Sequence, residues 1–311
     1  MNILKKIFLA FLLVALGCKN IHEQKQETQE IKLETGSVQV QGHRGDRGNF
    51  PENSIPAFIS AVKKGVDVVE LDVVISKDKK VVVSHEPFMS SLFVTTPTGD
   101  SIYKANERSY NMYQMTYDSI RQYDAGSRGN RLFPEQEKIR TFKPLLSEVI
   151  DSVQNFIAAK GLQPVKFNIE IKSVEAEYGK YQPEPDEFVD LVMKIIRKKG
   201  MENMISLQSF DPEILKLINN NFPEIKIAYL VYREGIEKNL SLLDFKPEIY
   251  SPNYTLVENE QFIDSIRSQE MKLIPWTVNE TKDIQKMIDL KVDGIITDYP
   301  ERVLKITKKT F

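Results

Sequence analysis

The sequence is poor in several residues from which functional sites are commonly built. Its 311 residues include one cysteine, one tryptophan and three histidines. A single cysteine excludes an intrachain disulfide framework and any metal site made of several cysteines. The 42 lysines and arginines are balanced by 44 aspartates and glutamates, so no basic field suggests nucleic acid as a partner. An anionic substrate must therefore be attracted by the site itself.

The apolar run near the N-terminus is too short to span a bilayer. Lys5 and Lys6 precede about ten apolar residues, against the ~20 that a membrane-spanning helix needs, and Ala-Leu-Gly-Cys follows at residues 15–18. We predict that residues 1–18 are a signal peptide. Its end resembles a bacterial lipobox, which implies cleavage before Cys18 and lipidation of the Cys18 thiol; the alternative is an ordinary secretory signal. Because Cys18 is the only cysteine, we favour a lipoprotein, anchored to a membrane of the bacterial cell envelope on the periplasmic side or at the surface.

The next segment, residues 19–36, is rich in glutamine, glutamate and lysine and has few large apolar side chains. Such a composition cannot bury enough surface to fold, so we predict a flexible tether and assign no catalytic role to His22 within it. Residues 37–311 make up the folded body. Their length suits one α/β barrel, for which ~250 residues are typical.

Eight segments of the body are predicted strands, and most are followed by apolar residues at helical spacing. The strands are expected near residues 38–43, 67–74, 165–171, 203–208, 225–231, 248–252, 271–277 and 293–297. The helices are expected at 54–64, 143–159, 186–198, 211–219, 258–268 and 281–290. This alternation predicts an α/β fold, a TIM (β/α)8 barrel. An open doubly wound sheet is the alternative, but no glycine-rich dinucleotide turn follows the first strand.

Two of the predicted strands carry acids among apolar residues. Glu70 and Asp72 are two apart, so both side chains point to the same face of their strand, and Glu170 recurs in a similar setting with Lys172 beside it. Carboxylates that share a face repel and lose solvation unless a cation lies between them. The residues alone leave two interpretations open: a site for a hard divalent ion such as Mg²⁺ or Ca²⁺, or a structural salt-bridge network that includes Arg44.

The two histidines of the body each end a strand-like run. His43 ends the first predicted strand, and His85 ends a short run at residues 81–84. A lone histidine in such a place is more often structural, but two of them beside inward-facing acids favour catalysis. Imidazole titrates near neutrality, so one ring can take a proton while the other gives one to a leaving alkoxide. We assign His43 as the base and His85 as the acid, although the order within the pair stays open.

Cationic and pocket-lining residues complete the predicted site. Arg44 offers a planar fork suited to phosphate oxygens, and Lys172 adds a point charge. Trp276 would give an aromatic wall to the carbon face of a substrate, or would pack beneath the mouth of the barrel. The side chains at further strand ends that we expect to line the pocket are Gln208, Ser251, Asn253 and Trp276.

In their order along the chain, these motifs resemble the glycerophosphodiester phosphodiesterase family. The segments that carry the resemblance are His43-Arg44-Gly45, Pro51-Glu52-Asn53-Ser54, Glu70-Leu71-Asp72-Val73, His85, Glu170-Ile171-Lys172, Trp276-Thr277-Val278-Asn279 and residues 293–300. They cover nearly all of the chain after the leader, and as an ordered set they are highly specific. One position departs from the pattern, because Glu86 stands where the family usually has aspartate.

The resemblance implies a metal-dependent enzyme that hydrolyses glycerophosphodiesters to glycerol 3-phosphate and an alcohol. It implies that both histidines are catalytic and that the three acids hold Ca²⁺ or Mg²⁺. It also implies attack by a substrate hydroxyl through a cyclic phosphate, whereas the residues leave direct attack by water open. We expect Glu52 to support Arg44 or His43, Asn53 to cap the following helix, and Asp298 to fix the last βα turn.

Residues 87–140 break the alternation of strands and helices with polar, tyrosine-bearing sequence. Their place after His85 resembles the small insertion of the family, so we expect them to stand over the active-site mouth and shape leaving-group selectivity. Two other functions stay possible: a phospholipase-type phosphodiesterase on intact lipids, or an inactive barrel that binds phosphorylated ligands. The oligomeric state is not encoded in any pattern that we can interpret.

Overall fold

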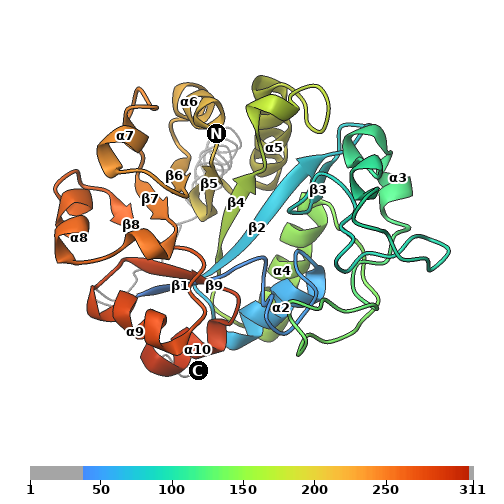
Figure 1. The fold of residues 1–311 in the computed structure, drawn as a ribbon, viewed down its shortest axis with the longest axis horizontal. Coiled ribbons are helices and arrows are strands. Elements are labelled where there is room, and N and C mark those ends of the chain that lie inside the picture. Colours follow the sequence, from blue (N-terminus) through green and yellow to red (C-terminus); the bar gives the residue numbers. More distant parts are fainter. Residues whose placement is uncertain (1–37, 308–311) are drawn as a thin grey trace, which may run out of the picture. The chain divides into compact units, whose positions relative to one another are not determined.

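The structure, a computed structural model, describes residues 38–307, and within them eight parallel strands form a barrel (Figure 1). The predicted boundaries for residues 1–18 and 19–36 lie outside the described residues. The strands of the barrel are β1 (Gln39–Gly42), β2 (Val68–Ile75), β4 (Lys166–Ile171), β5 (Ile205–Ser209), β6 (Lys226–Val231), β7 (Ile249–Pro252), β8 (Lys272–Leu273) and β9 (Gly294–Thr297). Neighbouring strands pair in parallel from β1 through β2, β4, β5, β6 and β7 to β8, and β9 pairs with β1.

Backbone hydrogen bonds close the ring between the segment of β8 and β9. The amide of Asp293 donates to the carbonyl of Leu273 at 2.9 Å, and the amide of Ile296 donates to the carbonyl of Pro275 at 3.0 Å. The amide of Val278 donates in turn to the carbonyl of Ile296 at 2.9 Å. The TIM barrel predicted from the sequence is therefore confirmed, with β8 shorter than the predicted strand.

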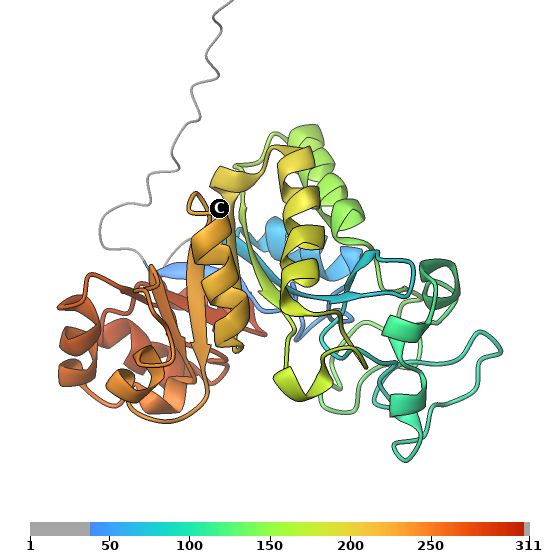
Figure 2. The same ribbon diagram turned by 90° about the horizontal axis from the view of Figure 1, so that it is seen from above.

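Helices follow the strands and surround the barrel (Figures 1 and 2). They are α2 (Ile55–Lys64), α4 (Leu146–Lys160), α5 (Pro185–Lys199), α6 (Pro212–Asn221), α7 (Ile236–Leu240), α8 (Glu260–Arg267), α9 (Thr281–Asp289) and α10 (Pro300–Thr307). The sequence analysis missed α10 and also α7, whose five residues are too few to show a clear helical period. Among the described residues, no helix is both long and apolar enough to cross a membrane.

The start of α2 corrects one predicted cap. Ser54, in an extended conformation, is the N-cap and accepts a hydrogen bond from the amide of Ala57, and Gly65 ends the helix with φ of 85°. Asn53 has a left-handed φ of 54°, which does not suit an N-cap, and its amide instead contacts Asp72. The predicted start of α6 is confirmed, because the Asp211 side chain accepts from the amide of Glu213.

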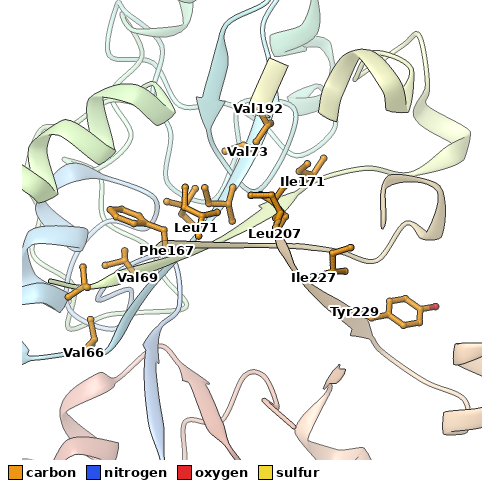
Figure 3. Packing of buried hydrophobic residues seen from close by; sticks show 14 of the residues in the cluster. Val66, Val69, Leu71, Val73, Phe167, Ile171, Val192, Leu207, Ile227 and Tyr229 are labelled. Atoms are coloured by element: carbon orange, nitrogen blue, oxygen red, sulfur yellow. The ribbon is translucent and has the colours of Figure 1, made fainter. Parts of the chain in front are cut away.

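Strand alternation separates the core from the site. The main hydrophobic core includes Val69, Leu71 and Val73 of β2, whose side chains point out of the barrel toward the helices. Phe167 of β4 and Val192 of α5 belong to the same cluster (Figure 3). The acids that alternate with them therefore point into the barrel. Burial of an apolar side chain of this size contributes about 1.5–3 kcal/mol to the free energy of folding. Packing of the apolar face of β2 therefore stabilises a strand whose other face carries acids.

The inside of the barrel has a polar half and an apolar half. On the side of β1 to β5, the Asn168 amide nitrogen donates to the side-chain oxygens of Gln41 at 3.0 Å and of Gln208 at 2.8 Å. On the side of β6 to β9, a separate apolar cluster packs against Trp276; its members are Ala228, Ile249, Ile274 and Ile296.

The segment predicted as an insertion has its own small core. After β3 (Val81–Val83), which pairs with β2 in antiparallel fashion, the chain forms η1 (Glu107–Ser109), η2 (Met112–Gln114) and α3 (Tyr117–Ile120). Both ribbon views show this segment to one side of the barrel (Figures 1 and 2). Its buried members include Met89, Val94, Met112 and Ile120, and they pack against Val74 and Val82 of the two strands.

Candidate active site

A cavity of about 290 Å³ lies at the carboxyl ends of the strands. This end of a TIM barrel is where active sites form. The residues that line the cavity come from most strands of the barrel: His43, Arg44, Arg47, Glu70, His85, Glu170, Lys172, Gln208, Phe210, Leu230, Trp276, Thr277 and Ile296. The structure thus brings the predicted histidines, cations and acids to one place, with Asp72 beside them.

Glu70, Asp72 and Glu170 form a buried carboxylate cluster, in which one oxygen of each lies within 4.8 Å of the others. Burial and then the charge of Asp72 raise the pKa of Glu70, and burial raises the pKa of Glu170 to about 7. Burial disfavours the charged form of Asp72 as well, but Arg44, His85 and Lys172 outweigh it, so the pKa of Asp72 is lowered. Three buried carboxylates this close call for a cation between them.

Polar neighbours hold each carboxylate in position. Glu70 accepts from the backbone amide of Arg44 and from the Gln208 amide, both at 2.8 Å. Asp72 accepts from the Asn53 amide at 2.7 Å through Oδ2, while its Oδ1 is buried without a hydrogen-bond partner among the described residues. An unsatisfied buried oxygen in a cluster of oxygen donors fits a hard divalent metal ion. The hydrogen bonds from Arg44, Gln208 and Asn53 are of the kind that orient metal ligands.

Each histidine is oriented by a carboxylate. His43 Nδ1 lies 2.7 Å from Asp298 Oδ1, and His85 Nδ1 lies 2.9 Å from Glu86 Oε1. Burial alone would raise the pKa of Asp298 and of Glu86, but their neighbours, His43 and His85 foremost, together outweigh it and lower both pKa values. An ionised carboxylate accepts the Nδ1 proton, which leaves Nε2 of each ring for proton transfer in the cavity. Glu86, at the position where the resemblance led us to expect aspartate, thus places a carboxylate against the His85 ring.

The two imidazoles should titrate below pH 6.5 in the metal-free protein. Burial lowers the pKa of His43 and of His85 and outweighs the opposing attraction of their carboxylates. A lowered pKa means that the rings are neutral at pH 7 and gain a proton only as the pH falls further. Titration of the imidazole resonances by NMR measures this directly. A midpoint at or above 6.5 for His43 would show that Asp298 dominates instead.

Arg44 is fixed by acids on two sides. Its Nη1 donates to Glu52 Oε1 at 2.7 Å, and its Nε lies 3.3 Å from Asp72 Oδ2. Arg47, which the sequence analysis did not single out, donates from Nε to the other oxygen of Glu52 at 2.7 Å and lies 3.6 Å from Asp298. The prediction that Glu52 supports Arg44 is confirmed. One carboxylate thus positions two guanidinium groups at the wall of the cavity.

A tight turn after β1 places these groups. Arg44 has a left-handed φ of 52°, a conformation that costs a non-glycine residue of order 1–3 kcal/mol. Gly45 follows with φ of 86°, and a Cβ there would lie 2.7 Å from the backbone of Ala57. The turn brings the Arg44 amide to Glu70 and the Asn53 side chain to Asp72, both on β2.

Lys172 and an aromatic group form the remaining wall. Lys172 Nζ donates to Glu170 at 2.7 Å and lies 5.8 Å from the ring centroid of Phe210. Trp276 packs edge-on against Phe210, with ring centroids 5.4 Å apart, and stacks with Tyr232 at 6.0 Å. Trp276 also donates from Nε1 to the backbone carbonyl of Ser251 at 2.8 Å, which fixes its ring at the cavity.

Some predicted residues do not line this cavity. Ser251 is buried and donates to the carbonyl of Ile274, and the Asn253 side chain accepts from the amide of Thr255 in the following turn. Asp298 was expected only to fix the last turn, but it also contacts His43. Asn279, just before α9, has the side chain of a typical helix cap, but its amide donates to Asp298 at 2.7 Å. The sequence around Asn279 indicates a helix start, but it does not show that the side chain contacts a residue 19 positions further along the chain.

A TIM barrel equipped in this way is a hydrolase of phosphate diesters, with a carboxylate cluster fitted to a divalent metal. The sequence profile described as "Glycerophosphoryl diester phosphodiesterase family" matches residues 43–302, so the chain belongs to this family. Its sequence is 31% identical over 272 residues to a glycerophosphodiester phosphodiesterase of Caldanaerobacter subterraneus, covering 87% of this chain and 98% of that one. The predicted family and enzyme class are therefore confirmed.

Solved structures share the fold. A protein of Silicibacter pomeroyi assigned to the same family has a TM-score of 0.78 and 28% sequence identity, covering 88% of this chain and 94% of that one. A phosphodiesterase of Oleispira antarctica, solved with the product sn-glycerol-3-phosphate, has a TM-score of 0.68 and 21% identity, covering 88% and 97%. At that identity, the second likeness concerns the fold.

Proposed function

We propose that this site hydrolyses glycerophosphodiesters to glycerol 3-phosphate and an alcohol, with His43 as the base and His85 as the acid. The observation that carries the proposal is the meeting of two carboxylate-oriented imidazoles with a three-carboxylate cluster at one cavity. An inactive barrel would have no need to keep both imidazoles paired to Asp298 and Glu86.

The chain's own residues supply binding and proton transfer. Arg44 and Lys172 bind the non-bridging oxygens of the phosphate, and the charge that grows on them in the transition state strengthens these contacts. His43 Nε2 takes the proton of the nucleophile, which is water or a hydroxyl of the substrate. His85 acts from its imidazolium form, with one proton on Nδ1 held by Glu86. It gives the second proton, from Nε2, to the alkoxide of the leaving alcohol as the bond of that alcohol to phosphorus breaks. Trp276 and Phe210 cover the carbon face of the glycerol.

We propose Glu70, Asp72 and Glu170 as the ligands of a divalent ion, Mg²⁺ or Ca²⁺. Three carboxylates without nitrogen or sulfur donors suit these hard cations. When bound, the ion would polarise the phosphate and neutralise the carboxylates that otherwise repel one another. Lys172, which contacts the phosphate, also pairs with Glu170, so it links the bound phosphate to one of the proposed metal ligands.

A substrate panel tests the function directly. The purified protein should release glycerol 3-phosphate from glycerophosphocholine, glycerophosphoethanolamine and glycerophosphoinositol, and release should stop with chelator and return when Mg²⁺ or Ca²⁺ is added. Diacyl phosphatidylcholine should be cut far more slowly, because a cavity of about 290 Å³ suits a deacylated head group. Faster cleavage of the diacyl lipid would favour a phospholipase-type activity instead.

We also propose that the protein is a lipoprotein of the bacterial cell envelope, held through Cys18. Support comes from the short charged and apolar leader and from the lone cysteine at its end. In a bacterium that processes lipoproteins, Cys18→Ala should move the protein from the membrane fraction to the soluble fraction with unchanged activity. Fractionation with mass spectrometry of the mature N-terminus measures this. Equal membrane association of both proteins would contradict the anchor.

A further inference from the structure

A second cavity, of about 690 Å³, lies within the insertion. It is more than twice as large as the catalytic cavity, and residues from the two ends of the segment line it, from Ser91 to Lys138. This part of the chain stands to one side of the barrel (Figures 1 and 2). Nothing in the proposed mechanism uses it.

The charge of this cavity has one sign. Lys104, Arg128, Arg131 and Lys138 line it, and no aspartate or glutamate is among the lining residues. Lys104 pairs with Glu107, and Arg128 donates to the backbone carbonyl of Ser91 at 3.0 Å. Arg131 and Lys138 have no ion pair within residues 38–307. Glu107 neutralises Lys104, which leaves three positive charges around one hollow, at Arg128, Arg131 and Lys138. On a chain whose formal net charge is -2, they form a local field that attracts an anion.

A buried amide points to the same kind of ligand. Asn130 lines the cavity and is 4% exposed. Its Oδ1 accepts from the amide of Leu132 at 3.0 Å, which fixes the orientation of the side chain, but its Nδ2 is buried without a hydrogen-bond acceptor among the described residues. Such a donor costs free energy, and an oxygen-rich ligand would supply the missing acceptor.

The wall of this cavity reaches the catalytic cavity through Arg47. Gln136 lines the insertion cavity and donates to the backbone carbonyl of Arg47 at 2.5 Å. Phe133, also in the lining, lies under the Arg47 guanidinium, with 4.5 Å from Cζ to the ring centroid. Arg47 itself lines the catalytic cavity. Arg47 therefore connects the two cavities: it lines the catalytic cavity and contacts Phe133 and Gln136 of the insertion cavity.

We propose that the insertion cavity is a second anion-binding site, which takes a phosphate group beside the catalytic cavity. Guanidinium and ammonium groups together with an amide donor are the side chains that recognise phosphate oxygens. The phosphate can belong to the alcohol half of the substrate, in which case the idea rests on the proposed function and defines a substrate class whose leaving alcohol is itself phosphorylated. It can also belong to a separate compound that is bound and not cut.

A binding experiment tests the site without any turnover. Inorganic phosphate is titrated into the wild-type protein, the variant R128Q/R131Q/K138Q and the control K160Q/K282Q/K286Q, which removes the same charge from exposed positions of α4 and α9. Wild type and control should bind with hydrogen-exchange protection at residues 128–138. The cavity variant should bind there at least about tenfold more weakly. Equal protection and affinity in all three proteins, or no protection at 128–138 in any, would overturn the proposal.

A kinetic comparison then distinguishes the two sources of phosphate. Glycerophosphoinositol and glycerophosphoinositol 4-phosphate differ by one phosphate on the leaving alcohol. If the site binds the substrate, the wild type should have a KM about tenfold lower for the phosphorylated compound than for glycerophosphoinositol. The cavity variant should have about the same KM for both compounds, with KM for glycerophosphoinositol unchanged. If binding is seen but the KM ratio is the same in both proteins, the ligand is a separate phosphate compound. Failure of the proposed function would instead leave both substrates uncut while phosphate still binds.

Discussion

Replacing His85 with alanine should lower kcat for glycerophosphocholine by ~10²–10⁴-fold, because the choline alkoxide then has to leave without a proton. The loss should shrink for the p-nitrophenyl ester of glycerol 3-phosphate, since a phenolate of low basicity leaves unaided. His43→Ala should cost a similar factor with both substrates, because the nucleophile must lose its proton in either case. Steady-state kinetics on the two esters measures both effects.

Controls make this comparison specific. His22→Ala changes the histidine that the sequence analysis left without a role, and its rates should equal those of the wild type. Glu86→Gln keeps the size of the side chain that lies 2.9 Å from His85 Nδ1 but removes its charge, so it should reproduce part of the His85→Ala defect with the same dependence on leaving group. If His43→Ala is the variant rescued by the p-nitrophenyl ester, the two roles are exchanged. Full activity in both alanine variants would refute the mechanism.

Replacing Glu70, one of the three proposed metal ligands, should separate activity from stability. Glu70→Gln should lower kcat/KM by ~10²–10⁴-fold, as expected when Lewis-acid stabilisation of several kcal/mol is lost. In the metal-free protein, however, Glu70 is buried beside two other carboxylates, and burial with the charge of Asp72 raises its pKa well above the ordinary value. A neutral amide relieves that repulsion but can keep only one of the two hydrogen bonds that Glu70 accepts, so the Tm of the metal-free variant should stay close to that of the wild type.

Metal titration completes the test. Mg²⁺ or Ca²⁺ should raise the Tm of the wild type, because an ion that binds only the folded state stabilises it, and should leave the Tm of Glu70→Gln nearly unchanged. Glu213→Gln, the same substitution at an exposed position of α6, should behave like the wild type in activity and in metal response. A variant at Glu70 that is much less stable without metal would favour a purely structural salt-bridge network.

Strand periodicity accounts for how much of the site was predictable. Glu70 and Asp72 alternate with apolar residues, and that pattern alone places them inside the barrel once β2 is recognised. The same holds for Glu170 and Lys172 of the β4 segment. Because all parallel strands of a barrel end on one side, residues at strand ends far apart in sequence meet there. The fold and most of the cavity therefore follow from local patterns.

Pairings across the chain were not predictable in the same way. His43 and Asp298 are 255 residues apart, and no local pattern at Asp298 shows that its carboxylate contacts an imidazole. Asn53 lies next to a serine that is the better cap, and only the left-handed turn shows that its amide reaches Asp72. Arg47 lies in a loop without periodicity. These contacts depend on the exact closure of the barrel, which a one-dimensional pattern does not contain.

The division of the barrel interior into a polar half and an apolar half has an evolutionary consequence. Glu70 is linked by hydrogen bonds through Gln208 to Asn168 and Gln41, so a change at any of these amides disturbs a proposed metal ligand and is tolerated poorly. The opposite half is a patch of aliphatic side chains under Trp276, where one apolar residue can replace another at little cost. Descendants of this barrel can therefore drift in substrate preference along β6 to β9 while the reactive half stays constant.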